Sequence, residues 1–261
     1  MTDLQGADIE NMLSKNQIKY YKSLQIKKFR QIHQSFTVEG AKSVTELLAS
    51  DFEVELVAVT EEFRAAHSRL LEALDAQVVT ATADDLAQMG SYQTNNACVA
   101  IAKTKENVFI DVAGKEFVIV LDDIRDPGNL GTIIRIADWY GFQKIVCSET
   151  TTDFYNPKVI AASMGSFTRI RIYYSNLVSY FEKAAPARVT GTFLEGMSLY
   201  DYNFPASGGY LVLGNEANGI SDAVSALVTD RVSIPRFGGA ESLNAGIAAA
   251  VICDNIRRQW K

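Results

Sequence analysis

The stretch "EFVIVLDDI", residues 116–124, is an unbroken apolar run that ends in two acids. A short, continuous apolar run is typical of a strand that is buried on both faces, as strands of parallel sheets are. Parallel strands are joined by crossovers, and a turn at Asp126 and Pro127 precedes a helical pattern here. The alternation of strand and helix patterns continues along the rest of the chain. It predicts an α/β domain with a mostly parallel sheet.

The later elements of this domain are expected from the same patterns. Further strands are expected at residues 144–149, 170–174, 188–194, 210–216 and 231–235. Asn156 and Pro157 form a typical helix start, and the last helix is expected from about Ser242 to Trp260. That last helix carries many small residues, which predicts close packing against a sheet or a place at a subunit interface.

The first hundred residues predict a second, smaller α/β domain. A helix-like stretch begins near Ile18, and strands are expected at residues 36–39, 54–60, 77–82 and 97–104. Helices are expected between them, at residues 40–49, 61–74 and 83–90. The polar segment 106–116 is broken by Gly114 and is the expected linker. The predicted domains are therefore residues 1–105 and residues 117–261.

Composition excludes several classes of protein. The 261 residues contain no apolar run near the roughly 20 residues that a membrane span needs, and the opening "MTDLQGADIENML" has no secretory pattern. Cys98, Cys147 and Cys253 are scattered, without the spacing of a zinc site or of a disulfide framework. We therefore expect a cytoplasmic protein with reduced thiols, no bound metal and no membrane partner.

Several enzyme classes lack their signatures. The chain has only two histidines, His33 and His67, and both lie far upstream of Ser242, so that serine has no evident base for a hydrolytic triad. The glycines near residue 130 stand at positions 128 and 131, which does not match the dinucleotide fingerprint. A phosphate-binding G-K-[ST] loop is also absent from the sequence.

Positive charge is concentrated near the N-terminus, although the formal net charge is −6. Residues 11–38 contain six basic side chains and no acid. Such a segment attracts a phosphate backbone, but it is also what an ordinary solvated helix face looks like. Both interpretations stay open for these residues: Lys15, Lys19, Lys22, Lys27, Lys28 and Arg30.

Three stretches resemble the motifs of the SpoU/TrmH methyltransferases, in the order that the family has them. They are "NLGTIIRIADWYGF" with Asn129, Gly131 and Arg135, "LVLGNEANGIS" with Gly214, Glu216 and Gly219, and "IPRFGGAESLNAGIAAAV" with Ser242 and Asn244. Upstream, residues 22–48 are similar to the opening of the small RNA-binding domain that many members carry. The resemblance covers nearly the whole chain.

This resemblance implies transfer of a methyl group from S-adenosylmethionine to a ribose 2′-hydroxyl in structured RNA, with ribosomal RNA favoured. It also implies a SPOUT-type catalytic domain with a trefoil knot and a homodimer formed through that domain. A transfer RNA methyltransferase and a non-catalytic RNA-binding protein on the same fold are the alternatives. The second would be expected to have damaged motifs, which this chain does not.

The resemblance also implies a set of catalytic residues. Arg135 would grip the ribose and its phosphate, since a guanidinium holds its protons to about pH 12 and binds phosphate bidentately. The proton acceptor stays open between Arg135, Glu216 and water. Asn129 would orient Arg135 or the ribose, Glu216 would align Arg135 or a backbone amide, and Ser242 and Asn244 would hydrogen-bond at a helix N-terminus. A turn residue, a helix-start carboxylate and simple helix caps are the respective structural alternatives.

The cofactor pocket, by the same resemblance, is made largely of backbone, with residues 192–196 closing it. Glycine permits close approach, whereas the aliphatic members would otherwise be ordinary core residues. The expected cofactor-binding residues are Thr192, Leu194, Leu213, Gly214, Ile234, Gly238 and Leu243. Arg236 stands where the family often has methionine. This loop of the protein is therefore not assumed to have the target preference of other family members. Ser163, Gly165 and Ser166 resemble a further family segment and either face the site or serve helix packing.

Overall fold

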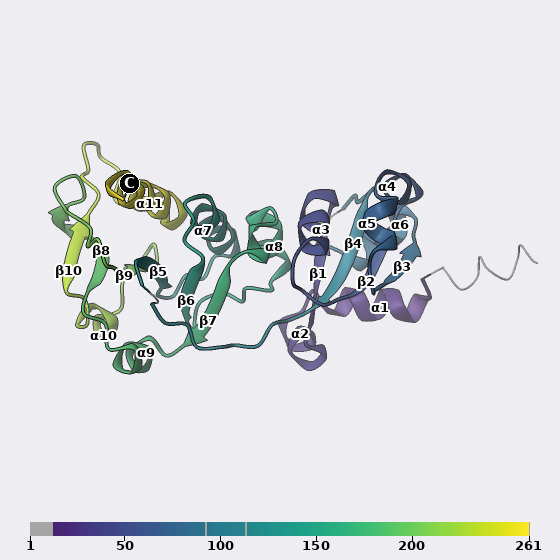
Figure 1. The fold of residues 1–261 in the computed structure, drawn as a ribbon, viewed down its shortest axis with the longest axis horizontal. Coiled ribbons are helices and arrows are strands. Elements are labelled where there is room, and N and C mark those ends of the chain that lie inside the picture. The colour runs from purple at the N-terminus through teal and green to yellow at the C-terminus, as the bar shows by residue number, and fades with distance from the viewer. Residues whose placement is uncertain (1–12, 92, 113, 261) are drawn as a thin grey trace, which may run out of the picture. The chain divides into compact units, whose positions relative to one another are not determined.

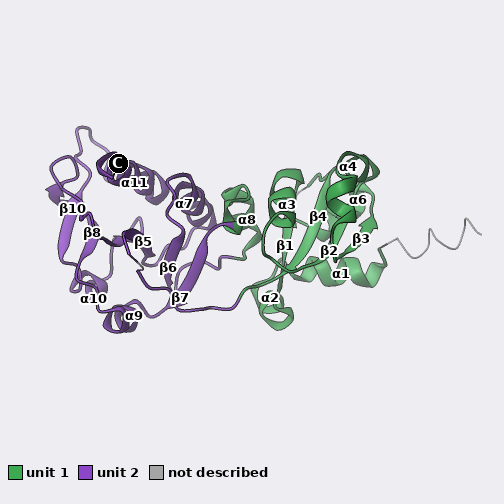
Figure 2. Ribbon diagram, in the orientation of Figure 1, with its two compact units in different colours: residues 1–105, 155–168 green, residues 106–154, 169–261 purple. Residues whose placement is uncertain are grey.

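The computed structural model describes residues 13–91, 93–112 and 114–260 and divides them into two compact units (Figure 1). Unit 1 contains the described residues up to Lys105 together with residues 155–168, and unit 2 contains the rest (Figure 2). The first boundary falls where the linker is expected to begin. The place of residues 155–168 in unit 1 is not evident from the sequence. Residues 1–12, on which the expectation of no secretory signal depends, lie outside the described residues.

Unit 1 is built on a four-stranded sheet in the order β1-β4-β2-β3. Its strands are β1 (Ser35–Glu39), β2 (Val54–Val59), β3 (Gln77–Thr80) and β4 (Cys98–Lys103). The β2–β3 pair is parallel, and β4 is antiparallel to both β1 and β2. Its helices are α1 (Lys15–Ser23), α2 (Lys27–His33), α3 (Ala41–Leu48), α4 (Glu61–Ala66), α5 (Ser68–Glu72) and α6 (Ala83–Met89). The expected helix at residues 61–74 is divided at His67, whose ring packs 4.2 Å from that of Phe63.

The break between α1 and α2 is held by Arg30. Its guanidinium Nη1 donates hydrogen bonds to the carbonyls of Leu24 and Gln25, each at 2.9 Å, and the residue is 3% exposed. These carbonyls follow the end of α1, where backbone acceptors lose their helical partners. The expectation that Arg30 belongs to an RNA-binding surface is therefore corrected, because a side chain buried in this way serves the turn. The five lysines are exposed.

Residues 155–168 pack on β1 of unit 1 through aromatic rings. They form α8 (Pro157–Ser163) and the 3₁₀ turn η1 (Ser166–Thr168). The ring of Phe36 lies 4.6 Å from that of Tyr155 and 6.0 Å from that of Phe167. Tyr155 also accepts a hydrogen bond from the Lys105 amide at 2.8 Å.

Packing also explains the small residues of this segment. A Cβ at Gly165 would lie 2.6 Å from the Glu46 side chain of α3, and Ser163 is fully buried. Ser166 is 6% exposed. Of the two interpretations left open for Ser163, Gly165 and Ser166, the structure therefore supports helix packing.

Unit 2 contains a six-stranded sheet in the order β10-β8-β9-β5-β6-β7, and every strand pair in it is parallel. The strands are β5 (Glu116–Leu121), β6 (Lys144–Ser148), β7 (Arg171–Ser175), β8 (Val189–Ser198), β9 (Gly208–Leu213) and β10 (Asp230–Ser233). The apolar run that opens the domain is thus the strand β5, next to the middle of the sheet and buried from Phe117 to Leu121. The predicted α/β architecture with a mostly parallel sheet is confirmed.

Helices cover both faces of this sheet. Figure 1 shows α7 (Pro127–Trp139) and α11 (Ala245–Gln259) along one face, and α9 (Leu177–Ala184) and α10 (Asp222–Ser225) along the other. Buried side chains of α9 and α10, such as Tyr180 and Val224, form one core with Val118 and Val120 of β5. All three cysteines are buried and free, and burial raises the pKa of the Cys98 and Cys253 thiols to about 12. They therefore act as inert core residues.

The small residues of α11 serve its packing against α7. A Cβ at Gly246 would lie 2.9 Å from Cγ2 of Thr132 on α7, so a side chain at that position would push the two helices apart. The helix begins after Asn244, which is its N-cap. The expected start at Ser242 is three residues too early, because α11 begins at Ala245.

The described residues contain no helix that is long and apolar enough to cross a membrane. Within the same residues, no group of three or more histidine, cysteine or acidic side chains is arranged to hold a metal ion.

Arg30→Met tests the structural role of this arginine. The substitution leaves the buried Leu24 carbonyl and the partly buried Gln25 carbonyl without their donor, and we expect the free energy of unfolding of unit 1 to fall by about 2–4 kcal/mol. Urea denaturation followed by circular dichroism measures the change. Lys28→Met, on the same helix but exposed, should shift the midpoint very little. Equal midpoints for the two variants would contradict the role given to Arg30.

Candidate active site

The first motif forms the start of α7, directly after β5. Asp126 is the N-cap, its carboxylate accepts a hydrogen bond from the Asn129 amide at 2.8 Å, and Pro127 occupies the first turn. These residues form a helix start for two reasons. Proline lacks an N–H group, but a helix makes no use of that donor in its first turn, and the aspartate side chain accepts a hydrogen bond from an N–H group that would otherwise have no partner. The result fixes the backbone of Asn129 at the carboxyl end of the sheet.

The side-chain amide of Asn129 joins three loops that are far apart in the sequence. Its Nδ2 donates to Oε1 of Glu216, in the loop after β9, and its Oδ1 accepts from Nδ2 of Asn244 at 2.7 Å. Asn244 in turn accepts from the amides of Gly246 and Ile247 at the start of α11. Three of the predicted catalytic residues thus form one hydrogen-bonded chain of side chains, in the order Glu216, Asn129 and Asn244. Of the two alignments expected for Glu216, the described residues show neither, because the carboxylate is bonded to the Asn129 side chain.

The loop after β9 turns back on itself in a very small space. Asn215 and Gly219 exchange two backbone hydrogen bonds, at 2.8 and 3.0 Å. A Cβ at Gly214 would lie 2.2 Å from the backbone of Gly219, and Gly219 itself has a positive φ of 69°. The chain's own backbone therefore requires glycine at position 214, in addition to any approach of a ligand.

Residues 192–196 of β8 are not paired with β10. Gly191 pairs with Arg231, and the next pair joins Met197 to Val232, so the β8 residues between Gly191 and Met197 have no partner on β10. A Cβ at Gly196 would lie 2.7 Å from the Arg231 carbonyl, so the two backbones approach closely there. Leu194 is 79% exposed and Leu243 is 46% exposed, which sets them apart from ordinary core residues. Leu213 is buried, Thr192 and Ile234 are half-buried, and Gly238 has open space where a Cβ would stand.

Arg135 and Ser242 stand outside the hydrogen-bonded chain. Both are exposed, and within the described part of the chain neither makes a hydrogen bond or an ion pair. Arg135 lies on α7, two turns of helix from its start, with its guanidinium available to a ligand. Ser242 does not cap α11, because Asn244 does.

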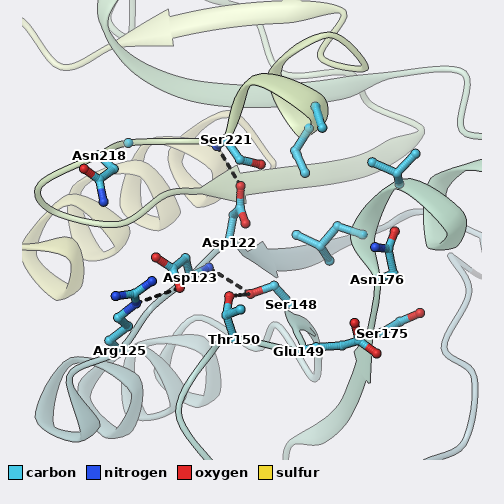
Figure 3. A pocket seen from close by; sticks show the side chains of 15 residues that line it. Asp122, Asp123, Arg125, Ser148, Glu149, Thr150, Ser175, Asn176, Asn218 and Ser221 are labelled. Atoms are coloured by element: carbon cyan, nitrogen blue, oxygen red, sulfur yellow. Dashed lines mark hydrogen bonds and ion pairs between the residues drawn. The ribbon is translucent and has the colours of Figure 1, made fainter.

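A separate pocket of about 420 Å³ lies at the carboxyl ends of β5, β6, β7 and β9 (Figure 3). Its polar lining includes Asp122, Asp123 and Asn176. The second motif supplies Asn218, Gly219 and Ser221 to its lining, but no motif predicts the pocket, because the other residues come from the ends of three further strands. Its lining contains none of the residues expected to bind the cofactor.

Comparison with known proteins identifies the family. The model of the SpoU rRNA Methylase family matches residues 116–254, and that of the MRM3-like substrate binding domain matches residues 15–100. The chain belongs to the SpoU rRNA Methylase family. The expected SpoU/TrmH family and the preceding substrate-binding type of domain are thus confirmed.

Relatives of this SpoU family chain cover almost its whole length. The 23S rRNA (guanosine(2553)-2'-O)-methyltransferase RlmP of Bacillus subtilis (strain 168) is 32% identical over 250 residues, which are 94% of this chain and 97% of that protein. The AdoMet-bound rRNA methyltransferase from Sinorhizobium meliloti has a TM-score of 0.86 at 26% identity, covering 96% and 97% of the two chains. The SpoU methyltransferase AviRb from Streptomyces viridochromogenes, in complex with AdoMet, has a TM-score of 0.85 at 25% identity, covering 95% and 98%.

A double-mutant cycle tests the hydrogen-bonded chain. Asn129→Ala and Glu216→Ala remove two partners of one bond, so their effects on the free energy of unfolding should be non-additive by at least about 0.5 kcal/mol. Urea denaturation of the two single variants and the double variant measures the coupling. Asn129→Ala combined with Ser242→Ala is the matched control and should be additive. Additive effects in the first pair would mean that Asn129 and Glu216 are not joined.

Proposed function

We propose that this protein transfers a methyl group from S-adenosylmethionine to a ribose 2′-hydroxyl in ribosomal RNA. The observation that carries the proposal is the hydrogen-bonded chain from Glu216 through Asn129 to Asn244, because it draws the three family motifs to one end of the sheet. RlmP and the Sinorhizobium meliloti protein named above are ribosomal RNA methyltransferases, and the Sinorhizobium and AviRb structures hold AdoMet. Ribosomal RNA is favoured over transfer RNA on the same ground.

S-adenosylmethionine, when bound, supplies an electrophilic methyl group on a sulfonium. The residues proposed to hold it are Thr192 and Leu194 of the unpaired segment, Leu213 and Gly214 at the end of β9, and Ile234, Gly238 and Leu243 before α11. They fit such a ligand because the exposed Leu194 and Leu243 offer apolar surface and the loops around them expose backbone groups.

The chain's own residues would hold the ribose and relieve its hydroxyl of a proton. Arg135 is exposed and without a partner in the described residues, so its guanidinium can grip a phosphate and stabilise charge on the attacking oxygen. Glu216 is held by Asn129 with one oxygen, and its carboxylate can accept further hydrogen bonds. The candidates for the proton acceptor are Arg135, Glu216 and water. Ser242 would act by hydrogen-bonding to a ligand, since it has no structural bond of its own.

We further propose that the protein is a cytoplasmic homodimer through unit 2, without a metal ion, and with the knot that the family resemblance implies. The support for the dimer is apolar exposure on the packed pair α7 and α11. Trp139 of α7 is 82% exposed and Ile247 of α11 is 53% exposed, so both helices offer large apolar side chains that a second copy could cover.

Arg135→Ala tests the central proposal. Removing the guanidinium should lower kcat/KM for methylation of ribosomal RNA by at least about a hundredfold, since it deletes a charge aimed at the reacting oxygen. Arg135→Lys keeps the charge but not the bidentate grip and should recover only part of the loss. Transfer of radiolabelled methyl measures the rate, and calorimetry measures binding of S-adenosylmethionine. Full turnover by the alanine variant would remove Arg135 from the mechanism, and no binding of the cofactor would remove the proposed reaction.

The exposed lysines of α1 and α2 are proposed to bind the RNA backbone. Replacing Lys22, Lys27 and Lys28 with glutamine should weaken RNA binding and reduce the slope of log affinity against log salt by about 2–3, because each phosphate contact contributes just under one. Fluorescence anisotropy over a salt series measures both. Lys115→Gln, an exposed lysine of unit 2, is the control. An unchanged slope in the triple variant would make this segment a solvated face.

A further inference from the structure

The pocket of Figure 3 lies where the strand order of unit 2 reverses. The chain goes from β5 outward to β6 and β7 and then returns to β8 and β9 on the other side of β5. Loops that follow β5 and β9 therefore diverge at this point, and such crevices are where open parallel sheets bind ligands. Figure 3 shows Asp122, Ser148 and Asn176 around the opening. The volume of about 420 Å³ is in the range of small-molecule sites.

The charge of the pocket excludes an anionic ligand. Asp122, Asp123 and Glu149 line it, and Arg125 is the single basic residue of the lining. Arg125 already donates to Asp123 at 2.9 Å. Burial pushes the pKa of Asp123 up, but hydrogen bonds from Arg125 and Thr150 outweigh it and hold the pKa below its usual value. An ionised Asp123 and a negative surround repel phosphate.

Asp122 presents one oxygen to the pocket. The residue is 5% exposed, and its Oδ2 accepts the Ser221 amide at 2.8 Å. Among the described residues no donor reaches Oδ1, so a carboxylate that can accept several hydrogen bonds has capacity left on its pocket side. A buried carboxylate with unused acceptors favours a ligand that carries N–H groups.

The rest of the lining combines aliphatic side chains with an amide donor. Leu177, Val178 and Val224 supply aliphatic surface. Asn176 uses its Oδ1 to cap α9, accepting from the Ser179 amide at 3.1 Å, which leaves its Nδ2 as a donor. The pocket therefore offers an acceptor, a donor and apolar walls, as sites for unstacked bases do.

We propose that this pocket binds a guanine base of the substrate RNA. Guanine has two adjacent donors, N1–H and the N2 amino group, which can both donate to the free Oδ1 of Asp122, and its O6 and N7 accept from an amide. Adenine and cytosine place a ring acceptor beside their amino group, which the carboxylate repels, and uracil has a single ring N–H. The pocket shares its loops with the active site, since Asn218 follows Glu216 and Asn215 donates to the Asp123 carbonyl at 2.8 Å. The proposal rests on the RNA methyltransferase function proposed above.

Binding of nucleosides to the full chain tests this pocket. Saturation-transfer NMR with guanosine, inosine and adenosine measures the three affinities. Inosine lacks only the N2 amino group and should bind about tenfold more weakly than guanosine, and adenosine more weakly still. Equal binding of guanosine and inosine would overturn the proposal.

Two variants locate the binding. Asp122→Asn keeps an acceptor for the Ser221 amide but loses the carboxylate, and Ala223→Leu narrows the pocket without removing a hydrogen bond. Both should weaken guanosine at least tenfold, whereas Asp222→Asn, on the same turn but outside the lining, should not. Unchanged binding in Ala223→Leu would place guanosine elsewhere, even if Asp122→Asn failed to fold.

Calorimetry with S-adenosylmethionine on the same samples separates the two proposals. Cofactor binding without guanosine binding overturns the pocket alone. Guanosine binding without cofactor binding supports the pocket and overturns the methyl transfer. Cofactor affinity should be the same in Ala223→Leu as in the unaltered protein, because no residue proposed to hold the cofactor lines this pocket.

Discussion

The arrangement of the active site depends on one side-chain amide. Asn129 donates to Glu216 and accepts from Asn244, so a single residue at the start of α7 joins the loop after β9 and the loop before α11. An amide suits this position because it is both donor and acceptor and carries no charge. An aspartate would oppose Glu216, and an aliphatic residue would leave both partners without their bond.

Close backbone approach sets the rest of the geometry. Gly214 lets the loop after β9 fold against Gly219, and Gly196 lets β8 rejoin β10 after the unpaired segment 192–196. Gly246 lets α11 lie against Thr132 of α7. These glycines hold the loops near one another, while Asn129 connects them. Arg135 and Ser242 are exposed and have no partner among the described residues, whereas Asn129, Glu216 and Asn244 are bonded to one another.

The sequence predicts the framework of this site better than its details. Buried parallel strands are evident from apolar runs such as residues 116–121, and the three motifs indicate which strand ends matter. The expected start of α11 at Ser242 is wrong because Ser242 and Asn244 are both good caps, two residues apart, and only the backbone decides between them. Arg30 looked like its lysine neighbours because a local pattern does not reveal a side chain that turns back to Leu24. The guanine pocket and the packing of residues 155–168 depend on contacts between distant segments, which no local pattern contains.

The most direct test of the account is hydrogen exchange in Asn129→Ala. If Asn129 holds the three loops, its loss should raise exchange at the Gly219 amide, which bonds to Asn215, and at the amides of Gly246 and Ile247, which bond to Asn244. The core of β5 should be unaffected. A variant in which exchange rises only near the start of α7, with both distant loops as protected as before, would contradict the claim.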